Sequence, residues 1–193
     1  MSERGIGAYM RWVVAAAGVA SLAWLVLAAR APRSGGLDRT AATGSAPSAE
    51  ACPVDAPDAP LDYTLKNVDD QPVRLADLKG KVVLLDFWAT WCGPCKVEIP
   101  GFVELQNRYG KDGLQIVGVS VDDTPDKLKP YIADMKMNYP VLQGLGHDDM
   151  LDAFGPMLGI PVSVIISRQG KICHRHMGLV EKEIFEQQIK GLL

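Results

Sequence analysis

The chain has 193 residues, of which 48% are hydrophobic and 22% are charged, and its formal net charge is −3. This length allows one ordinary domain with additional segments, but not two large domains, and the composition is typical of a globular protein with a substantial core. The sequence contains no basic block and no interleaving of arginines with aromatic residues, which argues against a nucleic-acid-binding protein.

The first expected element is an apolar segment near the N-terminus. Residues 12–29, "WVVAAAGVASLAWLVLAA", carry no charge, and about 18 residues in a helix just span a bilayer core. Trp12 stands at the edge of this segment, where an interfacial aromatic residue is expected. Residues 1–30 are therefore predicted to be an uncleaved membrane anchor. A cleaved signal sequence is the alternative, because "LAARA" offers small residues to a signal peptidase.

The next segment is predicted to be a flexible tether. Residues 31–57 are rich in Ala, Pro, Ser, Gly and Thr and show no apolar periodicity. The folded domain is expected over residues 58–193. The arginines on the two sides of the apolar segment nearly balance, so charge alone does not decide its orientation.

The domain is expected to begin with two short strands around "NVDDQ", followed by a helical turn that ends near Gly80. Residues 81–89, "KVVLLDFWA", form a dense apolar run that predicts a buried parallel strand. A helix should start at Cys92 and end at Gly110, with a kink at Pro100. Residues 114–122, "LQIVGVSVD", predict a second buried strand.

The rest of the domain also alternates between helices and strands. Thr124 is a candidate N-cap for a helix with Pro125 at its first position. The later elements are expected in four places: a strand at 139–144, a short helix at 148–155, a hairpin over 161–177, and an amphipathic helix at 181–193. This order predicts an α/β domain, a layered sheet with helices on both faces.

Cys92 and Cys95 form a CxxC motif, for which we considered three interpretations. Half of a zinc site would need two further ligands, and the remaining candidates do not form a second ligand pair: Cys52, His147, Cys173, His174 and His176. A purely structural disulfide is the second interpretation, and a redox-active pair is the third.

The redox interpretation explains more of the local sequence. The pair follows a buried strand and opens a helix, where free N–H groups and the helix dipole favour a thiolate at Cys92. Cys95 would lie one turn later and be more buried. An exposed attacking thiolate with a sheltered partner suits thiol–disulfide exchange. Trp88 and Trp91 are expected to form walls of the site.

Residues 82–100, "VVLLDFWATWCGPCKVEIP", resemble the active-site segment of the thioredoxin superfamily. They are most similar to the membrane-anchored TlpA/ResA-type thiol-disulfide oxidoreductases, and the likeness covers roughly residues 60–193. The resemblance implies a thioredoxin-like three-layer α/β/α fold with an N-terminal β-hairpin and a central helical insertion at about 124–137. It also implies an inner-membrane protein whose catalytic domain faces the periplasm. We expect no cofactor and no metal.

The resemblance assigns roles to four residues. Cys92 matches the nucleophile and Cys95 the resolving thiol. Asp86 matches the buried aspartate behind the pair, where a raised pKa would let it accept a proton from Cys95. Glu98 matches an acidic residue that could tune the thiol pKa values. The alternatives are a partly solvated strand-end carboxylate for Asp86 and a helix-surface carboxylate for Glu98.

Further residues are expected to contact the substrate. Trp91, Gly93 and Pro94 belong to the motif itself. The stretch "GIPVSVII" resembles the loop that carries the superfamily's cis-proline, with Pro161 as the candidate. Ile160 would then present its backbone to an extended substrate strand. Gly178 matches a glycine that lets the substrate backbone pass, although it could equally be an ordinary turn glycine.

The other two cysteines, Cys52 and Cys173, would form a structural disulfide if the first pair is catalytic. Such a bond would close a loop of just over about 100 residues, and the chain-entropy model gives it a stabilisation of at most about 4–5 kcal/mol. It would also require an oxidising compartment. Two independent free thiols are the alternative.

The predicted function is reduction of disulfides in client proteins, because Gly-Pro is the dipeptide between the cysteines of thioredoxin. The resemblance implies an integral-membrane thiol-disulfide interchange protein as electron donor, and clients in cytochrome c maturation or copper-site assembly. One alternative is a thiol-dependent peroxidase (an antioxidant activity) of the peroxiredoxin type. That class needs a threonine three residues before a lone cysteine, where this chain has Ala89. The other is a metallochaperone that uses the two cysteines and a histidine.

Overall fold

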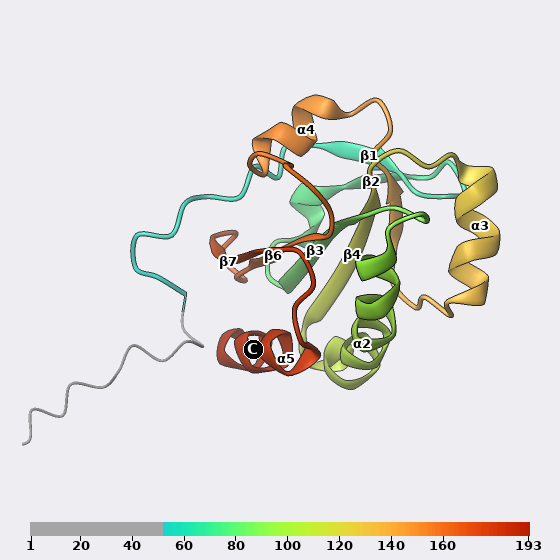
Figure 1. Cartoon of the computed structure of the whole chain (residues 1–193). Coiled ribbons are helices and arrows are strands. Elements are labelled where there is room, and N and C mark those ends of the chain that lie inside the picture. The colour runs from blue at the N-terminus through green and yellow to red at the C-terminus, as the bar shows by residue number, and fades with distance from the viewer. Residues whose placement is uncertain (1–51) are drawn as a thin grey trace, which may run out of the picture. The chain divides into compact units, whose positions relative to one another are not determined.

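The computed structural model describes residues 52–193 (Figure 1). The apolar segment at 12–29 and most of the predicted tether lie outside the described residues. Within residues 52–193, no helix combines the length and the apolar character needed to cross a membrane.

A mixed sheet of five strands forms the centre of the described domain, in the order β5-β4-β3-β6-β7. Its strands are β3 (Val82–Trp88), β4 (Leu114–Ser120), β5 (Val141–Gln143), β6 (Val162–Ile166) and β7 (Ile172–Met177). Strands β3, β4 and β5 are parallel, whereas β6 and β7 are antiparallel to their neighbours. Every residue of β3 is buried because the sheet is covered on both faces, which explains the unbroken apolar run in the sequence.

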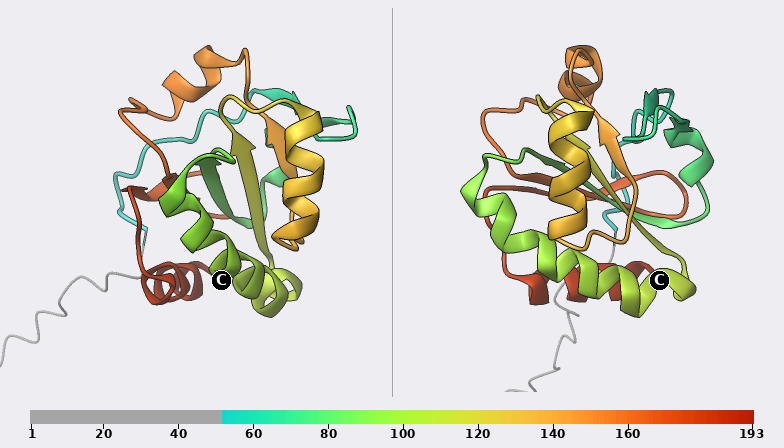
Figure 2. Two further views of the ribbon diagram at one scale, coloured as in Figure 1. Left: turned by 45° about the vertical axis from the view of Figure 1, so that its right-hand side comes forward. Right: turned by 90° about the vertical axis from the view of Figure 1, so that its right-hand side faces the viewer.

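Helices and the N-terminal hairpin cover the two faces of the sheet (Figures 1 and 2). A hydrophobic core lies on each face. One face is covered by α2 (Gly93–Tyr109), α3 (Pro125–Asp134) and α5 (Lys182–Leu192). The other face is covered by α4 (Asp148–Ala153), the hairpin β1 (Thr64–Lys66)–β2 (Pro72–Arg74) and the 3-10 turn η1 (Leu75–Leu78). Adjacent residues of β3 serve different cores, Leu84 the first and Leu85 the second. This arrangement confirms the predicted three-layer fold, its N-terminal hairpin and the helix between β4 and β5.

The predicted end of α2 and the predicted start of α3 are confirmed, because Gly110 is the C-cap of α2 and Thr124 is the N-cap of α3. Gly110 has a right-handed φ of −58° and starts a 3-10 turn, η2 (Gly110–Asp112). The chain reverses at Gly113 instead, where φ is 107° and glycine is favoured. Thr124 stands at the N-cap of α3, but its side chain makes no capping hydrogen bond.

Residues 52–57, which the sequence analysis assigns to the tether, contact the folded domain. Ala56 is buried. The N–H of Ile172 donates to the carbonyl oxygen of Pro57 at 2.9 Å. Cys52 is bonded to Cys173, so residues 52–57 are held against the β7 edge of the sheet.

Candidate active site

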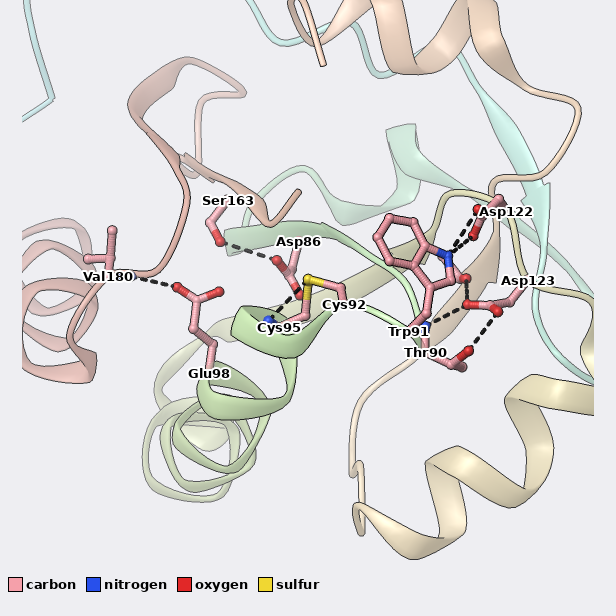
Figure 3. The surroundings of a disulfide bond; sticks show 11 residues. Asp86, Thr90, Trp91, Cys92, Cys95, Glu98, Asp122, Asp123, Ser163 and Val180 are labelled. Atoms are coloured by element: carbon pink, nitrogen blue, oxygen red, sulfur yellow. Dashed lines mark hydrogen bonds between the residues drawn. A yellow bond between two sulfur atoms is a disulfide. The ribbon is translucent and has the colours of Figure 1, made fainter. Parts of the chain in front are cut away.

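Cys92 and Cys95 are joined by a disulfide at the N-terminus of α2 (Figure 3). Cys92 is the N-cap residue of this helix in an extended conformation, and Pro94 follows within its first turn. The backbone N–H of Cys95 points at the Cys92 Sγ over an N···S distance of 3.2 Å. A thiolate at this position would therefore face a backbone donor and the positive end of the helix dipole.

The two sulfurs are less different in exposure than the sequence suggested. Cys92 is 3% exposed and Cys95 is 1% exposed, so both are buried in the disulfide form. The expectation of an exposed outer thiol is therefore wrong for this state. The reason is tertiary: Cys92 belongs to the same hydrophobic core as Cys95 and Ile99.

Asp86 lies beneath the pair, in the middle of β3, and is 1% exposed (Figure 3). The hydroxyl of Ser163 on β6 donates to its Oδ1 at 3.2 Å. Burial raises the pKa of Asp86 well above its usual value, the nearby Glu98 raises it further, and the Ser163 hydrogen bond opposes the shift. A carboxyl group with these properties can take up and hold a proton close to the sulfurs.

Glu98 is also buried, although it was equally compatible with a surface position on α2. The backbone N–H of Val180 donates to its Oε1 at 2.9 Å, whereas its Oε2 is buried without a hydrogen-bond partner among the described residues. Burial raises its pKa to about 7, and the Val180 hydrogen bond opposes the rise. Glu98 also lines a cavity of about 280 Å³ between α2 and the start of α5.

The residues expected to face the substrate come from two segments, the CxxC motif and the chain on either side of β6 and β7. Trp91 is 63% exposed, and Gly93 and Pro94 are exposed beside it. Immediately before β6, the strand next to β3, the Ile160–Pro161 peptide bond is cis. Gly178 has a left-handed φ of 82°, and its N–H donates to the Pro161 carbonyl at 2.8 Å, so it also shapes the turn that supports the proline.

Trp88 was expected to wall the site but is fully buried in the core. Its ring stacks against Tyr131 of α3 at a centroid distance of 5.2 Å. It therefore supports the layer between β3 and α3 and offers no surface to a substrate.

Two carboxylates that were not predicted from the sequence hold the loop between β3 and α2. Asp122 and Asp123 follow β4, and they accept hydrogen bonds from Trp91 and Thr90 respectively (Figure 3). A usable signal was present, since "VSVDD" ends a buried strand that is parallel to the strand before the CxxC motif. Parallel neighbours bring their carboxyl ends to the same edge of a sheet.

The second pair of cysteines also forms a disulfide. Cys52 and Cys173 have a Cα–Cα distance of 4.5 Å and are 121 residues apart in the sequence. This bond therefore fixes the first described residue to β7. Within residues 52–193, no group of three or more potential metal-ligating side chains comes together.

Comparison with known proteins gives consistent results. The AhpC/TSA family model matches residues 56–175. The chain is 30% identical over 130 residues to the thiol-disulfide oxidoreductase ResA of Bacillus thuringiensis subsp. konkukian, which covers 67% of this chain and 74% of that protein. It is 33% identical over 125 residues to the thiol:disulfide interchange protein HelX of Rhodobacter capsulatus, covering 64% and 68% respectively.

A solved structure supports the same assignment. The crystal structure of a thiol:disulfide interchange protein of the thioredoxin family from Chlorobium tepidum superposes with a TM-score of 0.64 at 31% identity. The match covers 72% of this chain and 98% of the other.

Proposed function

Since the chain belongs to the AhpC/TSA family of thioredoxin-like proteins and is a thiol-disulfide oxidoreductase, we propose that it reduces disulfides in client proteins outside the cytoplasm. The observation that carries this proposal is the position of the Cys92–Cys95 pair. It combines a helix N-terminus in front of Cys92 with a buried carboxyl group, Asp86, behind Cys95.

The reaction follows from this geometry. The Cys92 thiolate attacks one sulfur of the client disulfide, and the other client sulfur leaves as a thiolate. Cys95 then transfers its proton to Asp86 and attacks the Cys92 sulfur. The Cys92–Cys95 disulfide forms, the client is released as a dithiol once its thiolates are protonated, and the electron pair has moved from the protein to the client.

The location and the partners are part of the proposal. The apolar segment at 12–29 supports a single-pass anchor in the inner membrane, with the domain in the periplasm. The Cys52–Cys173 disulfide supports an oxidising compartment. A reductase in such a compartment needs electrons from elsewhere, so we include an integral-membrane thiol-disulfide interchange protein as donor. The resemblance of the CxxC segment to TlpA/ResA-type oxidoreductases favours clients with paired cysteines, in cytochrome c maturation or copper-site assembly.

A peroxidase function has less support from the site. Ala89 occupies the position three residues before Cys92 where the peroxidase pattern requires threonine. The neighbouring Thr90 hydroxyl donates to Asp123 at 2.7 Å and so is engaged away from the sulfur.

Substrate trapping tests the proposal. Cys95→Ser should accumulate mixed disulfides between Cys92 and client proteins in periplasmic extracts, because the resolving thiol is missing. Cys92→Ser is the matched control and should trap far less. If the trapped proteins lacked disulfides of their own, or if both variants trapped equally, the client-reductase function would be wrong.

The reduction potential of the Cys92–Cys95 pair tests whether the protein reduces or oxidises its clients. A reductase should have a value near that of thioredoxin, about −270 mV, whereas a value near −120 mV, as in a strong oxidant, would exclude net reduction of clients. Equilibration with glutathione or dithiothreitol buffers, followed by quantification of the Cys92–Cys95 peptide by mass spectrometry, gives this value without knowledge of the client.

A further inference from the structure

Two consecutive carboxylates, Asp122 and Asp123, accept hydrogen bonds from the loop between β3 and α2. Asp122 accepts from the indole Nε1–H of Trp91, with both oxygens at 3.0 Å. Asp123 accepts from Thr90 twice, from the backbone N–H at 2.7 Å and from the hydroxyl Oγ1 at 2.7 Å. The same carboxylate accepts the Ser120 hydroxyl at 3.0 Å.

Asp123 differs from Asp122 in its surroundings. Asp122 is at the surface, whereas Asp123 is 1% exposed. No ion pair of Asp123 is present among residues 52–193. Its three hydrogen bonds are therefore what compensates the burial of the carboxylate, and they fix its position firmly. Two of the three hydrogen bonds of this buried group come from the loop residue Thr90, which points to a role in the geometry of the loop.

The loop leads directly to the nucleophile. Thr90 is two residues before Cys92, and the Cys92 N–H donates to the Ala89 carbonyl at 3.1 Å, closing a tight turn around Thr90. The conformation of this turn decides where the Cys92 sulfur lies relative to the first N–H groups of α2. Figure 3 shows Asp122 and Asp123, with the loop residues that they bind, on one side of the disulfide, and Asp86 and Glu98 on the other.

We propose that Asp123 is a positioning residue that acts through Thr90 to hold Cys92 at the N-terminus of α2. This inference rests on the proposed thiol chemistry of Cys92. When the hydrogen bonds between Asp123 and Thr90 are lost, Cys92 moves away from the helix terminus that stabilises its thiolate. The Cys92 thiol then becomes less acidic, and the reduced form of the pair loses stability relative to the disulfide, so the reduction potential falls.

The test compares variants that keep or remove the hydrogen bonds. Asp123→Ala removes all three, and Thr90→Val removes only the hydroxyl donor. Asp123→Asn can accept from the Thr90 N–H and donate to its hydroxyl oxygen, and Thr90→Ser keeps the hydroxyl. Asp126→Asn, an exposed carboxylate three residues away, is the matched control.

The readout is the pH dependence of iodoacetamide alkylation of Cys92 in the reduced full-length protein, followed by peptide mass spectrometry. Asp123→Ala should slow alkylation below neutral pH by about fivefold, the order of a helix-terminus effect, and lower the reduction potential of the pair. Thr90→Val should change both quantities in the same direction. The effect of combining Thr90→Val with Asp123→Ala should be no larger than the effect of Asp123→Ala alone. Asp123→Asn and Thr90→Ser should stay close to wild type.

A purely structural role would lower the thermal stability of Asp123→Ala while Cys92 kept its wild-type alkylation profile and potential, and this outcome would overturn the inference. If Asp123→Ala does not fold, a wild-type pH profile of Cys92 alkylation in Thr90→Val would likewise overturn the inference. Alkylation needs no client, so failure of the proposed reductase function is detected separately by the inactivity of the wild-type protein.

Discussion

At the scale of single residues, the site is defined by two buried carboxyl groups without cations. Asp86 and Glu98 make no ion pair within the described part of the chain, and both have raised pKa values because burial disfavours their charged forms. The nearby Glu98 raises the pKa of Asp86 further. A carboxyl group with a raised pKa can accept and hold a proton that is released during disulfide exchange at the Cys92–Cys95 pair.

Glu98 makes stability depend on pH in a definite direction. Its pKa is raised from 4.5 to about 7 on folding. The folded state therefore binds the proton more tightly between these values, and stability is lost as pH rises through this window. Glu98→Gln should be more stable than wild type by roughly 1–3 kcal/mol at pH 8, with little difference at pH 4.

Urea unfolding at both pH values measures this difference. Glu183→Gln, at an exposed position of α5, is the control. A pH-independent difference between Glu98→Gln and wild type would show that Glu98 keeps an ordinary pKa in the folded protein.

Asp86 should affect the rate at which Cys95 attacks the mixed disulfide, but not the rate of the first attack by Cys92. Asp86→Asn keeps an acceptor for the Ser163 hydroxyl but cannot take the Cys95 proton. With reduced protein and 5,5′-dithiobis(2-nitrobenzoate), attack by Cys92 releases the first chromophore and attack by Cys95 releases the second. The second release should slow by at least about tenfold in Asp86→Asn near neutral pH.

The first release serves as the internal control for Cys92 in the same trace. Equal slowing of both phases, or of neither, would argue against a proton acceptor dedicated to Cys95. Above the pKa of Cys95 the defect should diminish, because the thiol then ionises without help.

At the scale of secondary-structure elements, the contact between β3 and β4 positions the site. The two strands pair in parallel so that Asp86 lies beside Gly118 and Trp88 beside Ser120. Gly118 leaves room for the Trp88 indole, since a Cβ there would stand 2.8 Å from Trp88 Nε1. The fully buried indole cannot move aside without disturbing the stacking on Tyr131.

Gly118→Ala should therefore destabilise the protein by about 1–3 kcal/mol through overpacking. Chemical denaturation measures this directly. Gly159→Ala is the control, because a Cβ at that position meets nothing within 4 Å. If Gly118→Ala were as stable as Gly159→Ala, the Trp88 layer would be more adaptable than its burial implies.

At the scale of the whole molecule, the two disulfides should contribute differently to stability. Cys52 and Cys173 are separated by 121 residues, whereas Cys92 and Cys95 are separated by 3. In the chain-entropy model, the disulfide that closes the long loop stabilises the folded state by about 5 kcal/mol, and the one that closes the short loop by about 2 kcal/mol. Cys173→Ser should thus lower the unfolding free energy more than Cys95→Ser does.

Denaturant unfolding of the two serine variants under non-reducing conditions makes the comparison. Cys52→Ser should reproduce the effect of Cys173→Ser, since either change opens the same bond. If Cys95→Ser cost the most, the long-range bond would have only a local effect on residues 52–57.

The order of strands and helices and the place of the CxxC motif at a helix start can be predicted from the amino-acid sequence alone. These features depend on residues close together in the chain, such as the apolar run before Trp88 and Pro94 within the first turn of α2. Apolar periodicity and the preferences of proline at helix ends are local properties, so they can be read without a structure.

The surroundings of the CxxC motif, in contrast, become visible only in the three-dimensional structure. Glu98 is buried because Val180, 82 residues away, lies over it, and Thr90 is clamped by Asp123, 33 residues away. Cys92 is buried for the same kind of reason. Burial and hydrogen-bond partners depend on which distant segments cover a residue, and that follows from strand register and layer packing, which no local pattern encodes.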